Sequence, residues 1–133
     1  MSRFASLVDI ADPAEPVCRG RFPGPDGRYD DLPRRFGPHC LHENRKGSYR
    51  SERLIFATYF NAGVRVYDLA DPDDPREIAH WVSETPPGQR APQANDLFVD
   101  LDGLIWVTDR THGGLFVLEP EPALAALMEE ART

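Results

Sequence analysis

Short runs of β-branched and aromatic residues, separated by turn residues, dominate the chain. Residues 53–59 and 64–69 form two such runs, and the Phe-Asn-Ala-Gly stretch between them contains Asn and Gly, which tolerate the positive φ of a tight turn. Asp-Pro follows the second run and stops it, because proline lacks the amide hydrogen that a central strand needs. The pattern predicts an all-β fold of short antiparallel strands.

The chain also repeats its own pattern. Residues 7–16 read LVDIADPAEP, and residues 66–75 read VYDLADPDDP. Further segments match in the same order, namely 54–58 with 104–108 and, more weakly, 39–44 with 95–100. A period of roughly 40–50 residues with short strands is typical of four-stranded β-propeller blades. About two blades are expected here, which is an incomplete ring.

These matches predict a single partial propeller domain. Its expected parts are the end of a preceding blade at 1–30, a complete blade at 36–83, three strands of a following blade at 93–119 and a C-terminal helix at 121–132. The helix is expected because Pro122 suits a first helical turn. Its apolar side chains also share one face, and they are Leu124, Leu127, Met128 and Ala131.

The repeated motif resembles the LVIVD-repeat β-propeller family. The resemblance rests on V-Y-D-[LI]-A-D-P-x-x-P at 66–75, its partner at 7–16, and the segments GPHCLHEN at 37–44, YFNAGVRV at 59–66 and DLFVD at 96–100. It spans most of the chain and is specific for the fold rather than for an activity. It implies that the chain looks like the C-terminal portion of a longer member, either as a gene fragment or as one component of an assembly.

A partner is expected because each blade buries its faces against its neighbours, so terminal blades expose apolar area. The side chains expected to be poorly covered are Val8, Ile10, Leu97, Phe98, Trp106 and Phe116. The predicted partner is a second copy of the chain, giving a homo-oligomer, or another propeller subunit.

Charge and composition narrow the partners further. The formal net charge of −7 would repel nucleic acid and anionic membranes, so neither is expected. No apolar run reaches the roughly 20 residues of a membrane span, and no signal-peptide pattern opens the chain. A cytoplasmic location is therefore predicted. Cys18 and Cys40 have no metal-binding spacing and are interpreted as free thiols.

The segment His39-Cys40-Leu41-His42-Glu43 carries the first candidate chemistry. In a regular strand side chains alternate between faces, so His39 and His42 could not chelate one metal ion. A metal would have to be shared across blades, where inner strands converge at the channel mouth. The candidate residues for that site are His39, His42, Asn95 and Asp96.

The related selenium-binding (methanethiol oxidase) propellers are similar in presenting histidines to a metal at that place. This resemblance implies a transition metal as cofactor, with His39 as the metal ligand and Asp96 beside it. The simpler interpretation is that His39 and Asp96 cap strand ends through backbone hydrogen bonds, and it is favoured.

A second cluster consists of Asp109, Arg110 and His112 in a predicted turn. Such a group could bind an anion or relay a proton. Hairpin turns also favour Asp, Thr and Gly for conformational reasons, and that interpretation is preferred.

Three functional hypotheses follow. The leading one is a non-catalytic propeller segment that acts as a binding or scaffolding module. The alternative is a metal-dependent oxidoreductase that uses copper, iron or zinc at the channel mouth. The third is a truncated remnant without independent activity.

Overall fold

The computed structural model describes residues 4–133, so the first three residues of the predicted preceding blade lie outside the described residues. The described chain forms three antiparallel sheets. They are β1 (Ser6–Asp9) with β2 (Val17–Arg21); β3 (Leu54–Thr58), β4 (Val64–Asp68) and β5 (Arg76–Trp81); and β6 (Ala94–Val99), β7 (Ile105–Asp109) and β8 (Gly114–Leu118). A 3₁₀ turn, η1 (Tyr29–Asp31), precedes β3, and the helix α1 (Pro122–Glu130) follows β8.

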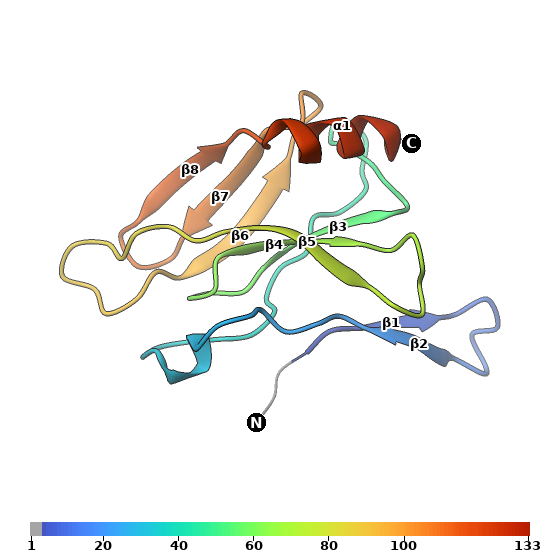
Figure 1. The fold of residues 1–133 in the computed structure, drawn as a ribbon, viewed down its shortest axis with the longest axis horizontal. Coiled ribbons are helices and arrows are strands. Elements are labelled where there is room, and N and C mark those ends of the chain that lie inside the picture. The colour runs from blue at the N-terminus through green and yellow to red at the C-terminus, as the bar shows by residue number, and fades with distance from the viewer. Residues whose placement is uncertain (1–3) are drawn as a thin grey trace.

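The predicted β fold with a C-terminal helix is confirmed, whereas residues 4–133 contain no closed barrel and no complete propeller ring. The sheets lie in layers, with β3–β4–β5 between the other two (Figure 1). One apolar cluster joins the second sheet to the third and another joins it to the first. Because side chains alternate along a strand, the second sheet supplies one set of residues to each cluster.

The hairpins β1–β2 and β4–β5 share the same irregularity. Their registers shift between Leu7 and Val8 in the first and between Val66 and Tyr67 in the second. In both loops the aspartate that ends the first strand accepts a hydrogen bond from the amide two residues later, at 2.9 Å and 2.8 Å. The two copies of the sequence motif therefore fold alike, bulge included.

The predicted strand at 39–44 lies beside β3 but pairs with it irregularly. The amide of His39 donates to the carbonyl of Thr58, and the amide of Thr58 donates to the carbonyl of Cys40, both at 2.9 Å. His39 and Cys40 therefore both lie opposite Thr58, as two residues lie opposite one in a β-bulge. Beyond them, an isolated bridge pairs Leu41 with Ala57. The strict alternation of side chains expected for this segment does not hold at His39 and Cys40.

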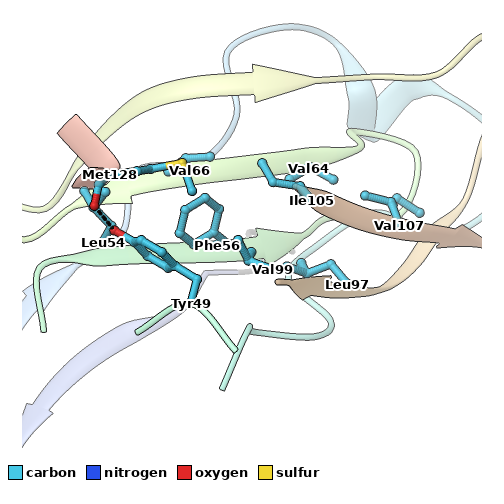
Figure 2. Packing of buried hydrophobic residues seen from close by; sticks show 11 residues of the cluster. Tyr49, Leu54, Phe56, Val64, Val66, Leu97, Val99, Ile105, Val107 and Met128 are labelled. Carbon is cyan, nitrogen blue, oxygen red and sulfur yellow. Dashed lines mark hydrogen bonds between the residues drawn. The ribbon is translucent and has the colours of Figure 1, made fainter. Parts of the chain in front are cut away.

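The helix α1 closes one end of the cluster between the second and third sheets. Met128 is fully buried there beside Leu54 and Val66, and the Tyr49 hydroxyl donates to the carbonyl of Met128 at 2.8 Å (Figure 2). Leu124, Leu127 and Ala131 pack against the same cluster, so the predicted apolar face of the helix is confirmed.

Replacing Met128 with alanine should lower the free energy of unfolding by about 2–5 kcal/mol, because the cavity cannot collapse between two sheets. Leu101→Ala is the matched control, since Leu101 is exposed in the turn after β6 and its truncation should cost about 0.5 kcal/mol or less. Urea unfolding followed by circular dichroism measures both. Equal losses for the two variants would show that α1 does not seal this core.

Candidate functional site

The third sheet presents an uncovered apolar face, here called the outer face of the third sheet. Cross-strand pairing aligns its side chains in two rows, Asp96–Thr108–Leu115 and Phe98–Trp106–Val117. The segment 40–45 borders this face, and together they line an open cleft of about 860 Å³. Two of the predicted channel-mouth residues, His42 and Asp96, lie in its wall.

The outer face of the third sheet matches a buried face of the second sheet position by position. Following the repeat, the matching pairs and their exposed fractions are Phe56 with Trp106 (1% and 36%), Val64 with Leu115 (2% and 58%) and Val66 with Val117 (2% and 47%). In the second sheet these positions are covered by the third sheet. In the third sheet no described residue covers them to a similar extent.

Cys40 connects His39 with Asp96. The Nδ1 atom of His39 lies 3.0 Å from the Cys40 sulfur, and the Asp96 carboxylate lies near enough to interact with the Cys40 thiol. The bulge opposite Thr58 makes the first contact feasible between neighbouring residues. Burial and the Asp96 carboxylate both raise the pKa of the Cys40 thiol, because each disfavours the thiolate. Cys40 is thus a poor nucleophile near neutral pH.

His42 is occupied by backbone groups on both ring nitrogens. Its Nε2 atom lies 2.8 Å from the carbonyl of Tyr49, which only accepts, and the amide of Val99 donates to its Nδ1 atom at 3.2 Å. The ring is therefore neutral and fixed between the 39–44 segment and β6. Burial lowers the pKa of His42. Its position serves packing, and neither nitrogen is left for a metal ion.

Asn95, like His42, makes a structural contact, since its backbone carbonyl accepts a hydrogen bond from the Thr58 hydroxyl at 2.9 Å.

Asp109 organises the turn between β7 and β8. Its carboxylate accepts hydrogen bonds from three amides and one hydroxyl, supplied by Gln93, Thr111 and Gly113. Burial raises the pKa of Asp109, but these hydrogen bonds outweigh it and hold that pKa below its usual range.

The remaining candidate residues, His112, Arg110 and His39, do not all lie together in the structure. His112 is exposed in the same turn with a φ of 74°, which is the left-handed region that tight turns use. Arg110 and His39 instead meet at the ring of Phe60, with the Arg110 guanidinium carbon 5.9 Å and the His39 ring 4.4 Å from the ring centre. The guanidinium carbon of Arg35 also lies near this ring, 5.8 Å from its centre. Phe60 and Arg35 were not predicted for this site.

Among residues 4–133, no group of three or more His, Cys, Asp and Glu side chains is arranged to hold a metal ion. The metal-dependent oxidoreductase stays a prediction. No helix in the described part of the chain has the length and apolar character of a membrane span. Cys18 and Cys40 are both free. Comparisons with models of known families, with curated proteins and with solved structures find no match.

The pH dependence of the free energy of unfolding should reflect the protonation of His42. Its pKa is lowered on folding, so below about 6.5, its value when unfolded, the unfolded chain binds more protons and stability falls as pH falls. Chemical unfolding at a series of pH values should show that His42→Gln flattens this decline. His112→Gln, a change at an exposed histidine, should leave it unchanged. A decline as steep in His42→Gln as in the wild type would contradict the assignment.

The reactivity of Cys40 should depend on Asp96. In a Cys18→Ser background, Asp96→Asn should raise the rate of Cys40 alkylation by iodoacetamide several-fold at mildly alkaline pH, because a carboxylate that disfavours the thiolate is removed. Asp102→Asn, in the exposed turn after β6, is the control and should have no effect. Mass spectrometry follows the reaction. Identical rates in the two variants would leave burial alone as the cause.

Proposed function

We propose that the chain is a non-catalytic binding module of the LVIVD-repeat propeller type, in which the outer face of the third sheet binds the first sheet of a second copy. The observation that carries this proposal is the match between exposed positions of the third sheet and buried positions of the second. Burying a side chain such as Leu115 or Val117 stabilises a complex by about 1.5–3 kcal/mol.

The order of layers within the chain supports a head-to-tail contact. The second sheet packs one face on the third sheet, and its opposite face on the first sheet. Each internal contact thus joins opposite faces of successive sheets. Two faces are left uncovered. The one on the third sheet corresponds to the face of the second sheet that packs on the third, and the one on the first sheet corresponds to the face of the second sheet that packs on the first.

The first sheet carries a matching uncovered face. Val8 is exposed there, as is Ile10 just beyond the end of β1, although Tyr67, the repeat counterpart of Val8, is fully buried in the second sheet. A contact between unlike faces is heterologous and continues from copy to copy, closing a ring where the rotation allows. This is how a chain of about two blades would take part in a propeller.

Sedimentation velocity at high micromolar concentration tests the proposal. The wild type should sediment as an assembly, and Leu115→Glu should weaken association by at least about tenfold, because a charge is placed in the apolar contact. Leu101→Glu is the control, since Leu101 is equally exposed, at 59%, but lies in the turn after β6 rather than on the sheet face. A monomeric wild type would refute the proposal.

Mixing two variants tests the head-to-tail geometry. Val8→Glu damages the first-sheet face and Leu115→Glu damages the third-sheet face, so each variant alone should remain monomeric. Together they retain one intact face of each kind and should form a dimer that grows no further. Association of Val8→Glu with itself would instead show that third-sheet faces bind each other.

A further inference from the structure

Two arginines and a histidine converge on one aromatic ring, that of Phe60, which lies between the end of β3 and the start of β6. Around Phe60, the guanidinium carbons of Arg35 and Arg110 lie 5.8 Å and 5.9 Å from the ring centre, and the His39 ring stands edge-on at 4.4 Å. The two arginines come from segments far apart in the sequence. The contact is therefore a product of the tertiary fold in a chain whose net charge is −7.

One buried residue, Gln93, is hydrogen-bonded to the backbone of both arginines. Gln93 is fully buried, and its side-chain oxygen accepts from the amide of Arg35 at 3.2 Å while its side-chain nitrogen donates to the Arg35 carbonyl at 3.1 Å. Its main-chain carbonyl accepts from the amide of Arg110 at 3.1 Å. A single residue thus fixes the backbone of both arginines. The position of the two arginines near Phe60 therefore does not depend on their flexible side chains alone.

Phe60 itself is held in a strained conformation. Its φ is 53°, in the left-handed region that residues with a side chain rarely adopt. Its carbonyl accepts from the amide of Ala94 at 3.0 Å, which ties the residue to the start of β6. Such strain persists where the surroundings enforce it and is common at binding sites. Here it places the centre of the ring 5.8 Å and 5.9 Å from the two guanidinium carbons.

The positive charges at this ring are not neutralised by the protein. Within residues 4–133, neither Arg35 nor Arg110 has a carboxylate oxygen within the 4 Å of an ion pair. Two other carboxylates have partners elsewhere: Asp109 accepts from the amides of Gln93 and Thr111, and Asp96 accepts from the amide of Leu97. Two exposed guanidinium groups without a carboxylate partner therefore lie at the same aromatic ring.

We propose that Arg35 and Arg110, with His39 at the edge, form a binding site for a phosphate-type dianion. Guanidinium groups present paired donors that match the oxygens of phosphate, and charge-assisted hydrogen bonds of this kind are strong. Two guanidinium charges match the two charges of hydrogen phosphate better than the single charge of a carboxylate. The site lies at strand ends, apart from the apolar rows of the outer face of the third sheet, and goes beyond the function proposed above.

Isothermal titration of the full chain with inorganic phosphate tests the site, at about 0.15 M salt so that diffuse attraction is screened. We expect saturable binding at one site. Arg35→Gln and Arg110→Gln should each weaken it by about tenfold or more, because a charge-assisted contact is lost. Arg50→Gln is the matched control, because Arg50 is an exposed arginine away from Phe60 and should bind as the wild type does.

Two further measurements keep the outcome decisive. The same titration in the Leu115→Glu variant should give unchanged phosphate affinity, which separates this site from self-association. Titration with acetate should give much weaker binding than phosphate. Absence of saturable phosphate binding, equal affinity in all three arginine variants, or tighter binding of acetate would each overturn the proposal. Circular dichroism of every variant verifies that the fold is retained.

Discussion

The packing of the second sheet on both of its faces is the constraint on which the rest of this structure depends. Its strands β3 and β4 bury nearly every side chain, which is why they read as almost continuous apolar runs. Among the polar residues of these strands, Arg65 is fully buried and pairs with Glu77 at 2.9 Å beside the Tyr29 ring. A sheet enclosed in this way fixes the spacing of both neighbours, and through them the faces that remain uncovered.

Much of this arrangement could be predicted from local patterns. The runs at 53–59 and 64–69 correspond to β3 and β4 within a residue or two, because β-branched and aromatic residues followed by Gly or Asp-Pro leave few alternatives. The helix was equally predictable, since Pro122 and the spacing of four apolar side chains define its start and its buried face. These features depend on residues close together in the chain.

The candidate site was less predictable because its geometry depends on distant segments. Alternation predicts that His39 and Cys40 point apart, yet both oppose Thr58 and lie in contact. His42 was a candidate for the channel-mouth site, but the backbone of Tyr49 and Val99 occupies its ring nitrogens. Nothing in the sequence marks Gln93 as the residue that joins two arginines, since a lone Gln carries no motif.

The bulge shared by the two hairpins bears on the shape of any larger array. A bulge increases the local right-handed twist of its strand, and here it recurs at the same position, after Leu7 and after Val66. If every further layer repeated the twist of these two, successive layers would differ by the same angular step. A constant step is what allows a stack of sheets to curve steadily about a single axis, and the size of that step would fix how many layers complete one turn.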